Sequence, residues 1–321
     1  MRPVVLTPHK DGIYSSFPTF VTYKDKVYLF YREGIRNFRQ VHGLFGKVKR
    51  MMFNENDFIN LLQGKSINIS SSEDIIFADE NELDAIVSKL EDNLFALCTR
   101  VYLKGVKNIC YVSFSSTPDF TSRTKIKIKD IILSAFYGKA FKSRYGYIFP
   151  AYGVICKNRD EVQRPLLLVT DGEYWDILAA LPTKINGNIL NETSLVFYKN
   201  LWHAFVREDN PPYGIWHFVS DNLLNWDKGK KLFFSAHAPM AFVDGDKIIL
   251  AFRYILSQKE FAIAYSYLFE EDLKINIIEY YQGNCFDGGY CDIGKIKKYL
   301  VILYYHDSGL SSPVIKGTLI H

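Results

Sequence analysis

A pattern of apolar runs recurs every fifty residues or so, by a rough count, along the 321-residue chain, and it predicts an all-β fold, a six-bladed β-propeller. Two further observations favour this class. Aromatic residues make up 16% of the chain, and rings fit the pleated, half-buried surface of a strand. Helical periodicity is confined to short stretches such as NDFINLL from Asn56.

The repeating unit is two apolar runs joined by a short polar turn. Its clear copies are FPTFVTYKDKVYLFYRE from Phe17, LDAIVSKLEDNLFALCTR from Leu83, ETSLVFYKNLWHAFVRE from Glu192, APMAFVDGDKIILAFRY from Ala238 and YCDIGKIKKYLVILYYHD from Tyr290. A weaker copy, KAFKSRYGYIFPAYGV, begins at Lys139. Because this third unit is poorly defined, a five-bladed ring is the alternative.

A third apolar run follows each pair and predicts a third strand. These runs are LFGKVKRMMF, ICYVSFSS, PLLLVTDG, GIWHFVSD, FAIAYSYLF and PVIKGTLI. One such unit cannot bury both of its faces, so the units are expected to pack side by side in a ring. The run PVVLT from Pro3 is expected to complete the last blade and close the ring, which removes an open sheet edge.

The most polar stretch is SINISSSEDIIF from Ser66, which we expect to be a loop or an outer strand. No linker rich in Pro, Gly or Ser divides the chain, and the composition does not shift along it. Residues 1–321 are therefore predicted to form a single β-propeller domain.

The formal net charge is +4, and Lys and Arg are scattered along the chain without a block of like charge. This pattern argues against a nucleic-acid partner and against membrane insertion. No apolar stretch has the length of a membrane span, and the first residues, MRPVVLTPHKDG, lack the apolar core of an export signal. We expect a cytoplasmic protein, unless it is released by a non-classical route or is a virion component.

Metal and cofactor chemistry find little support in the sequence. The seven histidines show neither HxH nor HxxxH spacing, and no Gly-rich phosphate loop occurs. Cys98, Cys110, Cys156, Cys285 and Cys291 show no CxxC spacing. We therefore expect no metal, no cofactor and reduced, packed thiols.

Charged residues occur at matched places in the repeat. The first two strands of a blade are antiparallel, so the beginning of the first and the end of the second lie at the same face of the disk. Second strands end in Arg32, Arg100, Arg207 and Arg253, with Tyr254, His306 and Asp307, and first strands begin with Asp84, Glu192 and Tyr290. These side chains are predicted to gather around one central mouth.

Four arginines gathered in a funnel would repel one another, and an anionic ligand is the usual reason for such a cluster. The alternative is that each Arg pairs with an adjacent Glu, as Arg207 could with Glu208. Tyr290 is a candidate nucleophile, because a buried Glu192 within reach could take the phenolic proton.

These residues resemble the sialidase superfamily of six-bladed propellers. NETSLVFYKNLWHAFVR is similar to the strand pair that supplies the catalytic Glu of that family and ends in an Arg, here Glu192 and Arg207. GYCDIGKIKKYLVILYY resembles the segment that holds the nucleophilic tyrosine, here Tyr290. APMAFVDGDKIILAFR supplies Arg253 where the resemblance implies a third carboxylate-binding arginine, and VTDGEYW and VSDNLLNW are similar to the Asp-box turns of these proteins.

The sequence also departs from that family. Ser16-Phe17-Pro18-Thr19 has no Arg where sialidases have Phe-Arg-Ile-Pro, and Arg32 on the neighbouring strand is the candidate replacement. The segment REGIRNFRQVHGLFGKV has no carboxylate after Glu33 to serve as the proton donor. His42 and Asp84 are the candidate donors instead.

We therefore predict a sialidase-like glycoside hydrolase that acts on an acidic or modified sugar through Tyr290, Glu192 and the arginine cluster. One alternative is a propeller that binds glycans without cleaving them, such as a virion or cell-surface receptor-binding protein. Another is a five-bladed arabinanase-like glycosidase that uses Asp11, Asp84 and Glu192, although that reading leaves the arginines unexplained.

Overall fold

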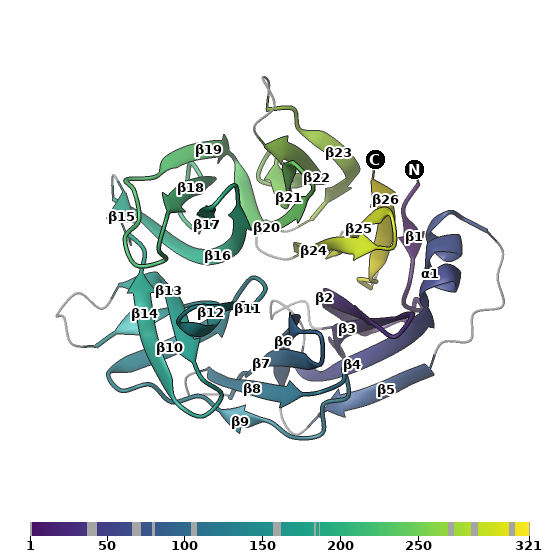
Figure 1. Cartoon of the computed structure of the whole chain (residues 1–321). Coiled ribbons are helices and arrows are strands. Elements are labelled where there is room, and N and C mark those ends of the chain that lie inside the picture. The colour runs from purple at the N-terminus through teal and green to yellow at the C-terminus, as the bar shows by residue number, and fades with distance from the viewer. Residues whose placement is uncertain are drawn as a thin grey trace.

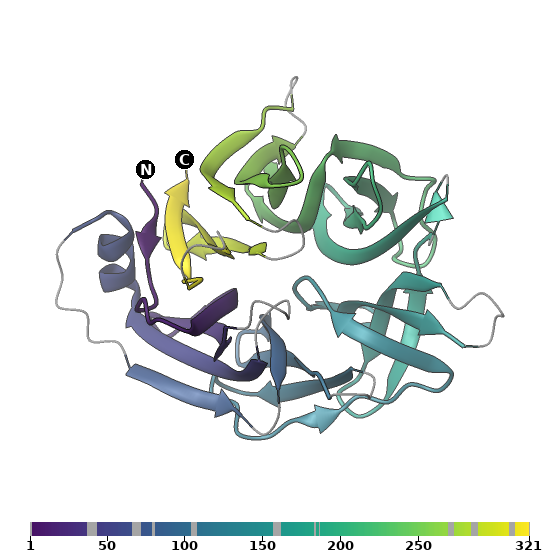
Figure 2. The ribbon, with the colours of Figure 1, turned by 180° about the vertical axis from the view of Figure 1, so that it is seen from behind.

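The computed structural model describes residues 2–36, 44–65, 72–78, 81–103, 108–156, 162–182, 184–185, 187–268, 273–283, 288–307 and 312–320. Within these residues the strands form six antiparallel sheets, which surround a central axis as the blades of a propeller (Figure 1; from behind, Figure 2). The six-bladed prediction is confirmed, and the five-bladed alternative is wrong.

The first blade contains β2 (Ile13–Tyr23), β3 (Lys26–Ile35), β4 (Leu44–Asn54) and β5 (Ser72–Phe77). The second contains β6 (Glu82–Glu91), β7 (Leu94–Val101), β8 (Ile109–Ser115) and β9 (Thr124–Lys125). The third contains β10 (Ile131–Phe136), β11 (Phe141–Ser143), β12 (Gly146–Ile155), β13 (Gln163–Thr170) and β14 (Trp175–Ala180).

The fourth blade contains β15 (Lys184–Ile185), β16 (Asn188–Tyr198), β17 (Leu201–Glu208), β18 (Gly214–Ser220) and β19 (Lys230–Phe234). The fifth contains β20 (Ala236–Asp244), β21 (Lys247–Ile255), β22 (Glu260–Leu268) and β23 (Asn276–Gln282). The sixth contains β24 (Gly288–Ile296), β25 (Tyr299–His306) and β26 (Lys316–Ile320), and β1 (Val4–Val5) completes it.

The two ends of the chain close the ring, as predicted from PVVLT. Strand β1 pairs with β26, with Val4 opposite Gly317, and both ends lie side by side in Figure 1. Beyond β1, the backbone N–H of Leu6 donates to the carbonyl oxygen of Ile315 over 2.8 Å. The last blade is therefore built from both ends of the sequence, and the edge of β26 is covered.

Leu6 anchors this closure, because its side chain is 7% exposed and packs in the apolar cluster between the first and last blades. We expect Leu6→Ala to lower the free energy of unfolding by about 2 kcal/mol, since the substitution leaves a cavity at the junction. Val5→Ala is the matched control: Val5 is 49% exposed, and its loss should cost less than about 0.5 kcal/mol. Urea unfolding measures both, and equal costs would contradict this role of Leu6.

The apolar core of the described residues is divided into six clusters, most of them lying between neighbouring blades. The cluster between the first and last blades also takes in Phe58 and Leu62 of α1 (Glu55–Leu62), the short helix that the sequence predicts. In the described part of the chain, no helix combines the length and the apolar character needed to cross a membrane.

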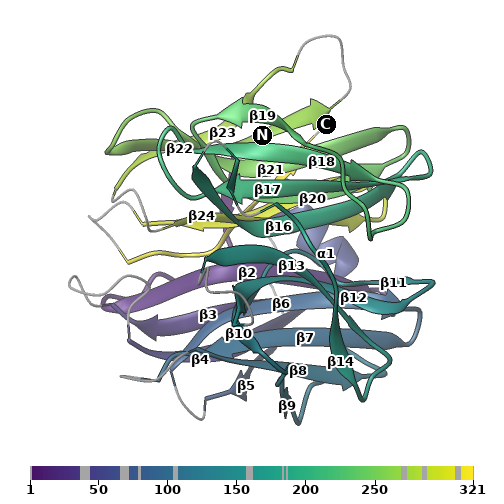
Figure 3. The ribbon, with the colours of Figure 1, turned by 90° about the vertical axis from the view of Figure 1, so that its left-hand side faces the viewer.

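The innermost strands depart from regular pairing where they approach the axis. Register shifts occur between Ser16 and Thr19, Glu82 and Asp84, Leu190 and Thr193, His237 and Met240, and Gly288 and Cys291. The strands cross the disk from one face to the other (Figure 3). Because a bulge re-aims the side chains beside it, these shifts turn residues toward the central axis at a similar level in several blades.

The inner strand of the third blade departs most from regular pairing. It is broken into β10 and β11, which both pair with β12. At the break, Gly138 has φ +84, and a Cβ there would lie 2.5 Å from the carbonyl oxygen of Thr193. Only glycine fits this approach to the next blade. The break explains why the third copy of the repeat is weak in the sequence.

Candidate functional site

A cavity of about 400 Å³ lies on the axis, among residues where the inner strands begin. It is lined by residues of β2, β6, β10, β12, β13, β16, β20 and β24 and by the ends of β7 and β17. Of the predicted residues, Asp84, Arg100, Glu192, Arg207 and Tyr290 line it. Ring geometry thus brings together residues that lie more than 200 positions apart in the chain.

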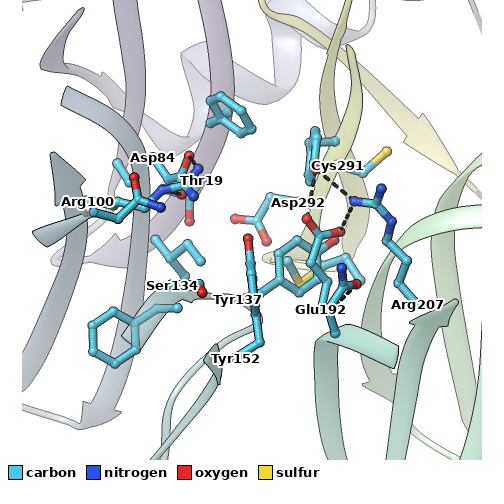
Figure 4. A pocket seen from close by; sticks show the side chains of 18 of the residues that line it. Thr19, Asp84, Arg100, Ser134, Tyr137, Tyr152, Glu192, Arg207, Cys291 and Asp292 are labelled. Atoms are coloured by element: carbon cyan, nitrogen blue, oxygen red, sulfur yellow. Dashed lines mark hydrogen bonds and ion pairs between the residues drawn. The ribbon is translucent and has the colours of Figure 1, made fainter. Parts of the chain in front are cut away.

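Tyr290, Glu192 and Arg207 form one connected group. The Tyr290 hydroxyl donates to Glu192 Oε1 over 2.8 Å, and Arg207 Nη1 donates to the Tyr290 oxygen over 3.2 Å. Arg207 Nη1 also lies 3.0 Å from Glu192 Oε2. Figure 4 shows Glu192 and Arg207 together on one side of the cavity.

The electrostatics of this group keep Tyr290 neutral at rest. Burial raises the pKa of Tyr290 well above its usual value, the Glu192 charge raises it further, and Arg207 and Arg253 only partly oppose the rise. The phenolic oxygen can therefore become nucleophilic only as its proton leaves. Glu192 Oε1 is the acceptor already in hydrogen-bond contact.

Local backbone geometry positions the pair. The Asn191 side-chain oxygen accepts from the Glu192 N–H over 2.7 Å, at the register shift of β16. Gly289 precedes Tyr290 with φ +80, and a Cβ there would lie 2.6 Å from Cδ of Arg253. Glycine at this position lets β24 pass close over Arg253 and carry Tyr290 into the cavity.

A second charged pair lies across the cavity. Arg100 binds Asp84 through two contacts, Nε to Oδ2 at 2.7 Å and Nη2 to Oδ1 at 2.8 Å. Figure 4 shows this pair on the opposite side from Glu192 and Arg207, with Asp292 between the two sides.

Asp292 lines the cavity and binds Lys139, which lies outside the lining. Asp292 is 1% exposed, and its Oδ2 accepts from Lys139 Nζ over 2.6 Å and from the Phe20 N–H over 2.8 Å. Lys139 Nζ also donates to Thr19 Oγ1 over 2.8 Å and to the Val87 carbonyl oxygen over 3.0 Å. Phe20 and Lys139 also line a second cavity, of about 700 Å³.

Two of the predicted arginines do not line the cavity, which corrects the expectation of a shared cluster of four. Arg32 is fully buried and donates through Nε to the Glu82 carbonyl oxygen. Arg253 is 1% exposed and donates through Nη1 to the Gly288 carbonyl oxygen over 2.6 Å, with Nη2 2.8 Å from His237 Nδ1. Burial and the neighbouring charges of Arg207 and Arg253 lower the pKa of His237, so its neutral ring can accept this bond.

Three other predicted ligands also lie outside the cavity lining. Tyr254 packs against the apolar cluster between the fourth and fifth blades. Asp307 pairs with Arg36 over 2.9 Å, and His306 stacks on Tyr281 with ring centroids 4.6 Å apart. These contacts engage them outside the cavity lining. The candidate donor His42 lies outside the described residues.

Glu279 contacts His306, Lys316 and Tyr304, and these contacts are expected to be sensitive to acid. Burial acts to raise the pKa of Glu279, but hydrogen bonds from His306, Lys316 and Tyr304 outweigh it and lower the pKa to about 2. A carboxyl group whose pKa is lower in the folded than in the unfolded protein stabilises the fold at pH values above its unfolded-state pKa. This stabilisation is lost as the pH falls toward its folded-state pKa.

We therefore expect the stability advantage of the wild type over Glu279→Gln to shrink between about pH 4.5 and pH 2. Thermal unfolding at a series of pH values measures the difference. An advantage that stays constant over this range would contradict the assignment.

Some cavity residues escaped the sequence analysis. The Tyr137 hydroxyl is buried without a hydrogen-bond partner in the described part of the chain, and Asp209 accepts from Arg207 Nη2 over 2.6 Å. Tyr137 and Lys139 lie in the break of the third inner strand, where the repeat is hardest to align. The glycine between them was the available signal.

The two turns that resemble Asp-boxes are each held by a side chain that accepts two backbone bonds. Asp171 Oδ1 accepts from the N–H groups of Glu173 and Tyr174, both at 2.9 Å. In the second turn Asn222, rather than the expected Asp221, accepts from Leu224 and Asn225. The resemblance of these turns to Asp-boxes stays a prediction.

The four described cysteines are free thiols. Cys98, Cys110 and Cys291 are buried as expected, whereas Cys156 is exposed at the end of β12. Cys285 lies outside the described residues.

No protein-family model matches this sequence, and no curated protein matches it. Among solved structures, a Dyadobacter fermentans protein of unknown function matches with a TM-score of 0.80 at 14% identity, over 99% of this chain and 97% of that chain. Trypanosoma rangeli sialidase in complex with sialic acid matches with a TM-score of 0.65 at 9% identity, over 99% of this chain and 57% of that chain. Penicillium chrysogenum α-L-arabinanase complexed with arabinobiose matches with a TM-score of 0.61 at 8% identity, over 99% and 98% of the two chains.

The chain is therefore a six-bladed β-propeller, and it shares this fold with the sialidase and arabinanase structures. More particularly, it has the sialidase-like propeller fold in a strongly divergent sequence, and it spans 57% of the length of that sialidase.

Proposed function

We propose that the protein is a retaining glycoside hydrolase in which Tyr290 is the nucleophile and Glu192 is its base. The observation that carries the proposal is the 2.8 Å hydrogen bond from the Tyr290 hydroxyl to Glu192 Oε1 inside the axial cavity. A carbohydrate is the proposed partner. The likeness of the fold to sialidase and arabinanase structures supports this class of reaction.

In the first step, the Tyr290 oxygen attacks the anomeric carbon of the sugar while its proton passes to Glu192. The bond from that carbon to the leaving-group oxygen breaks, and this oxygen takes a proton from a donor. In the second step, water attacks the anomeric carbon, and the Tyr290 oxygen leaves and recovers its proton from Glu192. The donor of the first step accepts the proton of the water.

Arg207 holds both partners of the proton transfer. Its Nη1 lies 3.2 Å from the Tyr290 oxygen and 3.0 Å from Glu192 Oε2. Because the guanidinium stays charged, it stabilises negative charge that develops on the phenolic oxygen during the attack.

The first step needs a proton donor for the leaving-group oxygen. Arg100 holds both oxygens of Asp84, because Oδ1 accepts from Nη2 over 2.8 Å and Oδ2 lies 2.7 Å from Nε in an ion pair. A leaving group would have to compete with Arg100 for this carboxylate. This engagement favours a second candidate function, a propeller that binds glycans without cleaving them. His42, the other candidate donor, keeps its place only as a sequence-based prediction.

The test is release of a fluorescent phenol from a panel of neutral and acidic aryl glycosides by the folded protein. We expect turnover of at least one glycoside, and a fluorinated analogue of that sugar should leave a covalent adduct on the peptide that contains Tyr290. Saturable sugar binding without any turnover would replace the hydrolase proposal by the binding module. An adduct on a different residue would overturn the role of Tyr290.

A further inference from the structure

Carboxylates outnumber cationic groups in the described lining of the cavity. Arg100 and Arg207 are its cationic side chains. Lys139 lies outside the lining and pairs with Asp292. The carboxylates are Asp84, Glu192, Asp209 and Asp292. Two cationic side chains of the lining thus face four carboxylates, which is the reverse of the electropositive funnel that the sequence predicts.

Each arginine of the lining is already committed to a carboxylate at short distance. Arg100 holds Asp84 through two contacts of 2.7 and 2.8 Å, and both side chains are only 15% exposed. An acidic sugar on Arg100 would either lie beside the like charge of Asp84 or displace Asp84, which would then stay buried without a partner. Leaving one member of a buried ion pair uncompensated is strongly unfavourable.

The same argument applies on the other side of the cavity. Arg207 contacts Glu192 at 3.0 Å and Asp209 at 2.6 Å. Its pairing with Glu192 is also part of the proposed proton transfer. A sugar carboxylate placed on Arg207 would therefore lie next to two like charges.

The other two arginines, Arg32 and Arg253, are buried in the fold and cannot contact a ligand in the cavity. Arg32 lies under Gly46, where a Cβ would meet its Nε at 2.5 Å, and Arg253 lies under Gly289. Both donate to main-chain carbonyl oxygens, of Glu82 and Gly288. Neither guanidinium lines the cavity that Tyr290 enters.

The uncharged part of the lining suits hydroxyl groups. Hydroxyl and amide side chains, which both donate and accept hydrogen bonds, come from Thr19, Asn108, Ser134 and Gln163. The Tyr137 hydroxyl is buried with no partner in the described residues, so a ligand hydroxyl at this position would relieve an unpaired polar group. Aromatic rings such as Phe17 supply an apolar surface for a sugar face.

We propose that the sugar bound beside Tyr290 is neutral, in place of the acidic sugar that the arginine pattern of the sequence predicts. This inference rests on the proposed function. It gives Asp84 and Arg100 the role of a hydrogen-bonding pair for sugar hydroxyl groups, with the carboxylate as acceptor and the guanidinium as donor.

Binding to the Tyr290→Phe protein tests the inference without turnover. The probes are methyl glycosides in matched pairs that differ only in a carboxylate, galactoside with galacturonide and glucoside with glucuronide, together with methyl arabinofuranoside and methyl sialoside. Ligand-observed NMR titration gives each Kd. We expect at least one neutral sugar to bind about tenfold or more tightly than the acidic sugars.

Acidic sugars that bind as tightly as the neutral ones, or more tightly, would overturn the neutral-substrate inference and leave the hydrolase proposal standing. If no sugar binds, the proposed function fails, and the inference fails with it. The two failures are therefore distinguishable.

A variant that removes the carboxylate partner of Arg100 tests whether the ion pairs cause the preference for neutral sugars. Asp84→Asn keeps the shape of the side chain and removes the charge that compensates Arg100, so we expect the preference to shift about tenfold or more toward the acidic member of each pair. Asp92→Asn is the matched control, because the Asp92 side chain is 98% exposed and pairs with Lys89 away from the cavity. The control should leave the preference unchanged.

Asp209→Asn provides a second variant, since Asp209 is 38% exposed and its loss frees one contact of Arg207. We expect Asp209→Asn to shift the binding preference toward the acidic sugars as well, so it serves as the test if Asp84→Asn does not fold. Folded variants whose preference equals that of the control would overturn the assignment of specificity to these ion pairs.

Discussion

Replacing Tyr290 with phenylalanine is expected to lower kcat by about three orders of magnitude or more, because the change removes the attacking oxygen and its proton relay to Glu192. The ring itself should stay in place, since it packs against Phe17 with centroids 5.0 Å apart and stacks on Tyr305. The measurement is kcat and KM on the best aryl glycoside of the panel. Glu192→Gln should lower kcat by about 10² to 10⁴, the range for losing a positioned base.

Tyr305→Phe is the matched control for this prediction. Tyr305 is a fully buried tyrosine next to Tyr290, but it does not line the cavity. The kcat of the Tyr305→Phe protein should stay within about twofold of the wild-type value, because the change lies away from the reacting atoms. If Tyr290→Phe retains activity comparable to this control, the nucleophile assignment is wrong.

Lys139→Met is expected to lower the free energy of unfolding by about 3 to 5 kcal/mol, the usual cost of stranding one partner of a buried ion pair. Asp292 is 1% exposed, so its charge would be left in the core. The ammonium group also bonds to Thr19 of the first blade and to Val87 of the second, while Asp292 belongs to the sixth. One side chain therefore links four blades at the axis. Denaturant unfolding measures the loss.

Two further variants separate the axial role of Lys139 from a general effect of losing a lysine. Lys142→Met removes a lysine whose side chain is 59% exposed and pairs with Glu91, so it should cost less than about 1 kcal/mol. Lys139→Met combined with Asp292→Asn should recover part of the loss, because no buried charge is then stranded. A Lys139→Met protein as stable as the Lys142→Met protein would refute the axial role.

Much of the architecture was predictable because it follows from local patterns. Alternating apolar runs and their turns predict the hairpins. The run PVVLT is predicted to pair with the last blade because the other strands of the ring leave one sheet edge open. The contact of Glu192 with Tyr290 also follows from pattern, since both begin an inner strand and ring symmetry brings such positions to one mouth. Arg100 and Arg207 reach the cavity by the same rule.

The sequence by itself thus determined the six-bladed ring, its closure and the residues at the starts of the inner strands. Only the tertiary structure decided which arginines face the ligand. Arg32 and Arg253 occupy the same repeat position as Arg100 and Arg207, yet carbonyl oxygens and glycine-lined space beside them hold their guanidinium groups out of the cavity. Strand pairing is set by short-range periodicity, whereas the direction of a long charged side chain is set by the partners that neighbouring blades offer, and those meet only in the folded ring.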